Sequence, residues 1–359
     1  VGALSLQISA ETEERAPTVA LIGCGPSGMF FLHALATRRK RLMDANDTDG
    51  LAMLPRVTCF ESSDKPGGIW RSQEDTVDEA HQPNIYDDCW SNKPKELVEF
   101  FDYTFQEHFQ GKEAPVYLPK TAMREYMLKR VHLADPNVFD AVKFSASVQS
   151  ILYNSSTEKF EVQYQQGAAV QLTDGVAIKE QFDYCICATG QHARPRIPRQ
   201  LLKLLRTGRS QVDIGDDDDE GVSEVPFQGT ILHSSHKSDF SAAVCEKTVV
   251  LVGDSASAED SALHAVKLGA RSVHILSRSG YGVCNDTGSW PGVDASTGEA
   301  KPKIHVHIAL PYKVTNAGTG LRCCGMEWSQ EDEVWERDEE APIVEIDNVD
   351  TIMFCQRFI

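Results

Sequence analysis

Val19-Ala-Leu-Ile-Gly-Cys-Gly-Pro-Ser-Gly28 is the stretch that decides the fold, because small apolar residues run directly into three glycines. This pattern predicts a buried strand, a tight turn and the start of a helix. In such a unit Gly23 makes the turn, Gly25 admits backbone N–H groups close to a pyrophosphate, and Gly28 lets the helix pack on the strand. We therefore expect a dinucleotide to bind at this turn.

The residues that follow support the same interpretation. Residues 56–60 predict a second strand that ends in Glu61, which is placed to bind a ribose diol. The interval from Gly28 to Glu61 is longer than the usual spacing of about 20 residues, and the polar stretch 38–50 accounts for the difference. An ordinary surface glutamate is the alternative. Residues 62–71 predict a loop at Gly67 and Gly68, with Trp70 either wrapping a cofactor or filling the core.

Composition restricts the class of protein. The 359 residues predict two domains, and 35 Lys and Arg against 53 Asp and Glu give a net charge of −18. Nucleic acids and anionic membranes are disfavoured as partners because both would be repelled. No run reaches the ~18 apolar residues of a membrane span. The ten cysteines suggest neither a zinc site nor a disulfide framework, so we expect no metal and a cytoplasmic location.

Several motifs together resemble the flavin-containing monooxygenases. They are the glycine turn, Glu61, Gly67-Gly-Ile-Trp70, and residues 85–105, where Ser91 and Asn92 match a Ser/Thr-Asn pair of the family. Residues 117–130 resemble the proline-led amphipathic helix of the family, which we read as packing only. Strands at 147–153 and 160–164 resemble its β-hairpin layer, and residues 182–190 end in an Ala-Thr-Gly crossover.

The family's identifying motif is only partly present. Phe227, Gly229 and His233 match it, whereas Lys237 stands where the motif has an aromatic residue. We interpret His233 as a residue that organises a hinge, because a hydrogen-bonded structural histidine is more common than an acid or base.

A second strand-turn-helix unit is predicted at residues 248–260. It begins at Gly253, and Ser255 and Ala258 replace the second and third glycines. The next predicted strand, 272–276, ends in Ser277 and Arg278 rather than in an acid. An arginine at this place matches a 2′-phosphate, so NADPH is the expected donor.

The resemblance implies an α/β flavoprotein with two dinucleotide-binding domains, in which a Rossmann-like NADPH domain is inserted into a Rossmann-like FAD domain. The expected boundaries are 1–193 for the first part of the FAD domain, 194–313 for the NADPH domain and 314–359 for a return segment to the FAD domain. Within these ranges we expect 279–297 and 322–340 to be long loops. The resemblance covers residues 18–354, and it implies that further segments complete the FAD domain after Ile359.

The resemblance also implies which residues contact FAD and NADPH. Those expected to bind the cofactors are Gly23, Gly25, Pro26, Ser27, Gly28, Glu61, Gly68, Ile69, Trp70, Ser91, Asn92, Val148, Thr189, Gly190, Gly253, Ser255, Ala256, Ser257, Ala258, Asp260, Ser277 and Arg278. Asn92 is the one expected catalytic residue, hydrogen bonding at the flavin N5 or at the hydroperoxide.

The implied activity is insertion of one oxygen atom from O2 into a nucleophilic nitrogen or sulfur of a small molecule, through a C4a-hydroperoxyflavin. Paired redox cysteines of a disulfide reductase are not present at the expected spacing, which favours oxygen as acceptor. Two alternatives stay open. One is a Baeyer–Villiger monooxygenase acting on ketones, and the other is a truncated, non-catalytic nucleotide-binding protein.

Overall fold

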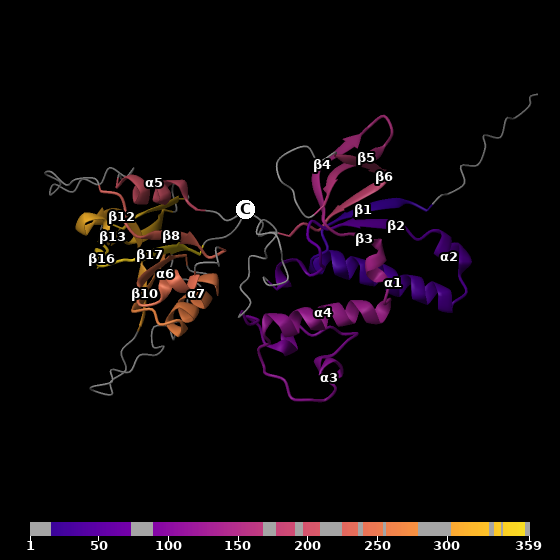
Figure 1. The fold of residues 1–359 in the computed structure, drawn as a ribbon, viewed down its shortest axis with the longest axis horizontal. Coiled ribbons are helices and arrows are strands. Elements are labelled where there is room, and N and C mark those ends of the chain that lie inside the picture. The colour runs from indigo at the N-terminus through magenta and orange to yellow at the C-terminus, as the bar shows by residue number, and fades with distance from the viewer. Residues whose placement is uncertain are drawn as a thin grey trace, which may run out of the picture. The chain divides into compact units, whose positions relative to one another are not determined.

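The computed structural model describes residues 16–72, 89–167, 177–190, 197–208, 225–235, 240–253, 256–278, 303–329, 334–338 and 340–355. The predictions for Lys237, Ser255 and 279–297, and the part of the 85–105 motif before residue 89, lie outside these ranges. The chain divides into two units, Val1–Gly190 and Gln191–Ile359. Each unit is described separately below, and Figure 1 labels the elements of both.

The first unit is organised around a four-stranded parallel sheet of order β3-β2-β1-β7. The predicted strands are confirmed: β1 spans Thr18–Ile22 and β2 spans Arg56–Phe60, in register from Thr18 with Arg56 to Ile22 with Phe60. The outer strands are β3 (Val142–Lys143) and β7 (Tyr184–Cys187). The central strand β1 is almost completely buried, as expected for a strand covered on both faces.

Helices cover one face of this sheet and an antiparallel sheet covers the other. The helices are α1 (Pro26–Asp44), α2 (Thr48–Ala52), α3 (Phe105–His108) and α4 (Lys120–Ala134). The antiparallel sheet has the order β4-β5-β6, with β4 at Ala146–Asn154, β5 at Lys159–Gln166 and β6 at Ile178–Phe182. Alternate residues of β1 pack into the layers on opposite faces of the sheet. Leu21 packs with α1 and α4, while Ala20 and Ile22 pack with the hairpin layer.

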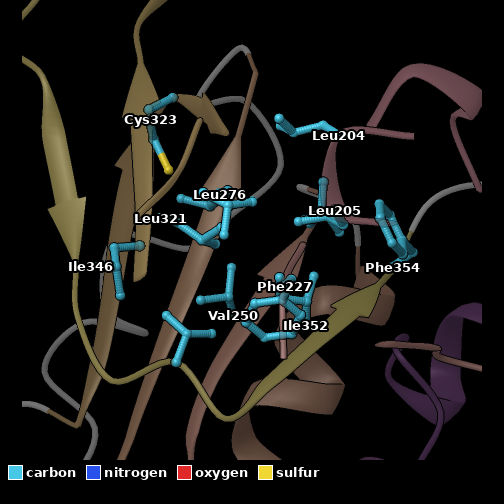
Figure 2. Packing of buried hydrophobic residues seen from close by; sticks show 14 residues of the cluster. Leu204, Leu205, Phe227, Val250, Leu276, Leu321, Cys323, Ile346, Ile352 and Phe354 are labelled. Carbon is cyan, nitrogen blue, oxygen red and sulfur yellow. The ribbon is translucent and has the colours of Figure 1, made fainter. Parts of the chain in front are cut away.

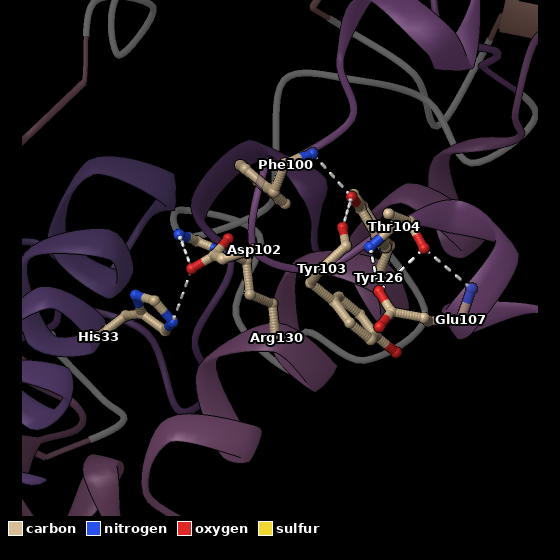
Figure 3. Close-up of polar contacts among 8 residues, drawn as sticks. All are labelled: His33, Phe100, Asp102, Tyr103, Thr104, Glu107, Tyr126 and Arg130. Carbon is tan, nitrogen blue, oxygen red and sulfur yellow. Dashed lines mark hydrogen bonds and ion pairs between the residues drawn. The ribbon is translucent and has the colours of Figure 1, made fainter.

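Helix α4 fastens the segment that precedes it in the sequence. The Tyr126 hydroxyl accepts a hydrogen bond from the Phe100 N–H at 2.9 Å and donates one to the Tyr103 carbonyl (Figure 3). One turn further, the Arg130 guanidinium binds both oxygens of Asp102 at 2.8 and 2.9 Å. The predicted packing role of this helix is confirmed, because its apolar residues Met123, Tyr126 and Met127 are buried.

The second unit contains a five-stranded parallel sheet of order β11-β10-β9-β17-β8. Its strands are β8 (Thr230–His233), β9 (Thr248–Val252), β10 (Ser272–Ser277), β11 (Ile304–Ile308) and β17 (Thr351–Phe354). Strand β17 lies between β8 and β9 and pairs in parallel with both. This strand is therefore an internal part of the second sheet although it follows β9, β10 and β11 in the sequence.

The two faces of this sheet carry different layers. One face packs on α6 (Phe240–Val244) and α7 (Ala256–Lys267). The other packs on α5 (Arg199–Thr207) and on an antiparallel sheet of β12 (Leu310–Thr315), β13 (Gly320–Cys324) and β16 (Val344–Ile346). Figure 2 shows the core on the face that carries α5 and the antiparallel sheet, where side chains such as Leu205 and Ile352 gather between the layers.

The predicted long loop at 322–340 is wrong. Residues 322–324 belong to β13, and Met326–Ser329 (β14) pairs with Val334–Arg337 (β15) as a two-stranded antiparallel ribbon. The acidic composition concealed a period-two pattern, and the backbone register places position 328 opposite position 335.

The boundaries 193/194 and 313/314 stay predictions. The structure divides the chain at Gly190/Gln191. Residues 340–355 and the strands before them pack in the second unit, and β12 crosses position 313 without interruption. The described part of the expected return segment is thus integrated in the second unit through β13, β16 and β17, where apolar faces of these strands complete its core.

Candidate functional site

The first glycine turn has the geometry that the sequence predicts. Gly23 has a φ of 101°, and a Cβ at this position would lie 2.5 Å from the Ala188 carbonyl oxygen. A Cβ on Gly28 would collide with the carbonyl oxygen of Gly23. Glycine is therefore required at both positions, one for the turn and one for the contact of helix with strand.

A second glycine segment lies against this turn, backbone to backbone. The Gly67 N–H donates to the Cys24 carbonyl at 2.9 Å, and a Cβ on Gly68 would be only 3.0 Å from the Gly25 Cα. Helix α1 begins at Pro26 directly beside this contact, and its N-cap Gly25 supplies no side-chain hydrogen bond. The first-turn N–H groups have no partner within the helix and carry its positive dipole end, so a pyrophosphate fits here.

Glu61 follows β2 and is buried beside the turn. Its Oε2 accepts the Cys24 N–H at 2.7 Å, while its Oε1 accepts the Ser63 N–H at 2.9 Å and the Ser63 hydroxyl at 2.6 Å. A carboxylate oxygen has two acceptor lone pairs. Oε1 is thus fully used by Ser63, with the Ser62 hydroxyl a further donor at 3.4 Å, and Oε2 keeps one acceptor site for a ligand hydroxyl. This arrangement fits a ribose, and the carboxylate is held in place before any ligand binds.

The Gly67–Gly68 loop continues into a short 3-10 helix, Gly68–Trp70, which contains Ile69. The Trp70 side chain is half-buried and packs against two clusters, one under α1 and one that includes Leu118. Packing on the core, the alternative raised for this tryptophan, is therefore part of its role. Its contact with a cofactor stays a prediction.

Ser91 and Asn92 lie on a strip that is paired with the chain just before α4. The Ser91 N–H donates to the Leu118 carbonyl at 2.7 Å, and the Ser91 hydroxyl accepts the Leu118 N–H at 3.0 Å. Trp90 pairs with Pro119 in the same strip. Ser91 thus fixes the backbone on which Asn92 is presented, and the Asn92 side chain is exposed.

The remaining predicted residues of the first unit lie on β4 and after β7. Val148 is half-buried against the hairpin-layer core and next to an irregularity in the β4–β5 register. Thr189 and Gly190 are exposed, and a Cβ added to Gly190, which has a φ of 80°, would meet no atom within 4 Å. The Ala188 N–H before them donates to the Ile22 carbonyl at 2.8 Å, so the crossover meets the first glycine turn.

The second turn lies at the carboxyl ends of β9 and β10. Gly253 has a φ of 134°, its N–H donates to the Leu276 carbonyl at 3.0 Å, and a Cβ would lie 2.8 Å from the Cys355 carbonyl oxygen. Helix α7 begins at Ala256, followed by exposed Ser257 and fully buried Ala258. Alanine at 258 thus provides the close helix-to-strand contact expected of the third glycine.

Two ionisable side chains, Asp260 and Arg278, belong to the second turn and its neighbouring strand end. Burial and the neighbouring Glu259 raise the pKa of Asp260 to about 6, so this acid at the start of α7 loses its charge in mildly acidic solution. At the end of β10, Ser277 is buried and Arg278 is exposed. An exposed guanidinium at this sheet edge can reach an anionic ligand.

His233 ends β8 and is fully buried. Its Nδ1 accepts the Ser235 N–H at 3.1 Å and lies 3.0 Å from the Ser235 hydroxyl. The histidine orders the two residues after the strand, which agrees with a structural role. A hinge function stays a prediction.

Sequence reasoning missed the residues that support the two turns. These are Ser63, which orients Glu61, and the backbone of Ala188 and Cys355, which face Gly23 and Gly253. The available signal for Ser63 was its position, because it places a hydroxyl two residues after the strand-end acid Glu61. Across the described ranges, no group of three or more His, Cys, Asp or Glu side chains is placed to hold a metal ion. Among the helices of those ranges, none is long and apolar enough to cross a membrane.

Comparison with known proteins identifies relatives for this arrangement. The family model described as flavin-binding monooxygenase-like matches residues 18–292. A trimethylamine monooxygenase of Pelagibacter sp. strain HTCC7211 is 32% identical over 261 residues, which are 72% of this chain and 50% of that protein. The chain spans about half the length of the curated relatives it matches first.

Solved structures agree. The crystal structure of Tmm from the same Pelagibacter strain superimposes with a TM-score of 0.64 at 27% identity, covering 95% of this chain and 61% of that one. An S-allyl-L-cysteine S-oxygenase from Allium sativum gives a TM-score of 0.60 at 20% identity, covering 96% and 63%. The second likeness shows the fold alone.

Proposed function

This chain belongs to the flavin-binding monooxygenase-like family, and from that premise we propose that it is an FAD- and NADPH-dependent monooxygenase. Its reaction transfers one oxygen atom from O2 to the nitrogen of a small amine. The observation that carries the proposal is that the chain has two glycine turns, one in each unit. Each turn lies at a strand-to-helix junction of a parallel sheet.

The first turn holds FAD. The N-terminus of α1 and the backbone of Gly25 and Gly68 receive the pyrophosphate, and the remaining acceptor site of Glu61 Oε2 receives a ribose hydroxyl. The flavin supplies the redox chemistry, by accepting hydride and activating oxygen. The protein's own side chains orient the cofactor and hold the surrounding backbone in place.

Asn92 is the residue that acts nearest the reacting atoms. Its carboxamide can donate and accept hydrogen bonds, and Ser91 holds its backbone through two bonds to Leu118. A neutral amide orients an oxygen-bearing group without protonating it, which favours transfer of oxygen over release of peroxide.

The second turn holds NADPH. Gly253 and the start of α7 receive the pyrophosphate, and Arg278 pairs with the 2′-phosphate. Because the pKa of Asp260 is raised to about 6, the repulsion between this helix start and an anionic ligand falls as the solution becomes mildly acidic. The cysteines described are free thiols, which supports a reducing cytoplasm as the location.

A small tertiary amine of the trimethylamine type is the proposed substrate, because the trimethylamine monooxygenases share about a third of their aligned residues with this chain. Oxidation of a nucleophilic sulfur is the second candidate, since a nucleophilic lone pair is the common requirement. Ketone oxidation and a purely nucleotide-binding role stay as alternatives for the test.

The test measures trimethylamine N-oxide, hydrogen peroxide and NADPH consumption for the FAD-loaded protein. Asn92→Ala is expected to keep FAD and accept hydride while releasing more peroxide and less N-oxide per NADPH. Asn137→Ala is the matched control, because Asn137 is also exposed in the first unit and caps its 3-10 helix without a side-chain bond.

Each result has a distinct meaning. Unchanged coupling in Asn92→Ala would remove Asn92 from the mechanism. Turnover of a thioether alone would move the assignment to sulfur, and turnover of a cyclic ketone alone would move it to Baeyer–Villiger chemistry. A protein that binds nucleotide without oxidising any of these compounds would contradict the proposed activity.

A further inference from the structure

Two thiols lie side by side at the end of β7. Cys185 and Cys187 are alternate residues of one strand, so their side chains leave the same face of the sheet. Cys185 is half-buried against the core under the hairpin layer, and Cys187 is exposed. Burial, and then the adjacent Cys187 thiol, raise the pKa of Cys185 to about 11.

This pair differs from the other cysteines of the described residues. Cys24, Cys59, Cys323, Cys324 and Cys355 are buried, which keeps them from solutes. Cys89 is half-buried, and Cys245 is exposed on the second unit. Reactive thiols combine exposure with a nearby second thiol that resolves the first oxidation product. Cys187 has the exposure, and Cys185, which keeps its proton, can donate a hydrogen bond to a Cys187 thiolate.

The strand can accommodate closure of this pair. Alternate Cα atoms of a strand lie about 6.6 Å apart, from a rise of about 3.3 Å per residue. Bridged cysteines span about 4.4–6.8 Å, so a bond is possible once the strand curves slightly. Among the described strands, β7 pairs with β1 alone.

We propose that Cys185 and Cys187 form a peroxide-sensitive dithiol that closes to a disulfide. The Cys187 thiolate attacks hydrogen peroxide, the O–O bond breaks, and Cys187 becomes a sulfenic acid while hydroxide leaves. The Cys185 thiol then attacks that sulfur, an S–S bond forms and water leaves. Overall, two thiols are oxidised by two electrons and one peroxide is reduced to two waters.

Closure is transmitted directly to the first glycine turn. Ala188 follows Cys187, donates to the Ile22 carbonyl at 2.8 Å, and its own carbonyl oxygen lies where a Gly23 Cβ would be 2.5 Å away. This packing has no room for displacement. A tighter curve at 185–187 therefore shifts Ala188 against Gly23 and weakens FAD binding. This consequence, unlike the thiol chemistry, rests on the proposed function.

The thiol chemistry is tested by titrating the reduced protein with hydrogen peroxide and mapping thiols by mass spectrometry. The peptide containing Cys185 and Cys187 is expected to lose two hydrogens, whereas Cys245 is expected to stop at its sulfenic acid, because the local Cys185 thiol resolves only the Cys187 product. In Cys185→Ser the Cys187 sulfenic acid is expected to persist and to react with dimedone. Absence of a bond between Cys185 and Cys187, or a persistent Cys187 sulfenic acid in the unaltered protein, would overturn the proposal.

The effect on the turn is tested separately by FAD titration before and after oxidation. A roughly tenfold weaker affinity, restored by dithiothreitol and absent in Cys187→Ser, is the expected result. If FAD binds equally to both forms, the coupling to Gly23 is wrong while the dithiol stands. If FAD binds to neither form, the proposed function fails, and the peroxide titration still decides the dithiol.

Discussion

At the scale of single residues, Glu61 shows how one side chain serves both the fold and a ligand. Three bonds to Cys24 and Ser63 hold its carboxylate, and one acceptor site is left at the turn. The sequence predicted this acid from its place at the end of a strand. For Ser63 the sequence offers only a hydroxyl two residues after this acid, which is a weak signal because a hydroxyl bond depends on the path of the loop and not on spacing alone.

Arg278 carries the prediction on donor choice. In Arg278→Ala, the preference of flavin reduction for NADPH over NADH is expected to fall by roughly tenfold or more, because a charge-assisted hydrogen bond is worth about 1.5–3 kcal/mol. The measurement is the concentration dependence of anaerobic flavin reduction by each nucleotide. Arg271→Ala is the control, because Arg271 is also an exposed arginine and lies just before β10, the strand that Arg278 follows. Equal affinities for both nucleotides in the unaltered protein would contradict the assignment.

At the scale of elements, Tyr126 fastens the segment 100–104 to α4 (Figure 3). Removing its hydroxyl in Tyr126→Phe leaves the Phe100 N–H and the Tyr103 carbonyl without this partner. The expected loss of folding stability is about 1–3 kcal/mol for such a buried group. Hydrogen exchange is expected to accelerate in residues 98–105. Tyr117→Phe, at an exposed tyrosine, serves as the control. Unchanged exchange in this segment would show that ring stacking with Phe105 alone holds it.

Strands β10 and β11 carry a pH-dependent group. His274 stacks on His305 and His307, and its Nδ1 lies 3.1 Å from the His307 Nε2. Burial, and then these two histidines, lower the pKa of His274 to about 4. Because the unfolded chain binds this proton near pH 6.5, the contribution to folding stability is complete above that pH and is lost as pH falls toward 4.

The full loss amounts to about 3.5 kcal/mol, from about 1.4 kcal/mol per pKa unit, and about 2 kcal/mol of it falls between pH 6.5 and pH 5. Hydrogen exchange of β9 and β10 at pH 7.5 and pH 5 measures this part, and His274→Gln is expected to reduce the difference between the two pH values. His132→Gln, at an exposed histidine of α4, should leave it unchanged. The same pH dependence in His274→Gln and the unaltered protein would refute this explanation.

At the scale of the whole molecule, the sequence predicted both nucleotide-binding units from local patterns around Gly23 and Gly253. It failed where contacts join distant segments. Strand β17 enters the second sheet between β8 and β9, about 100 residues after β9 in the sequence. This pairing has no local signature, since it depends on which strand edges remain open once the rest of the unit has folded.

The central claim is that the first glycine turn belongs to an FAD site. Extraction and identification of the cofactor from the purified protein, with reduction of the bound flavin by NADPH beforehand, tests it most directly. We predict FAD, reduced by NADPH more readily than by NADH. Recovery of FMN, or a protein that takes up no flavin when FAD is added, would contradict the account.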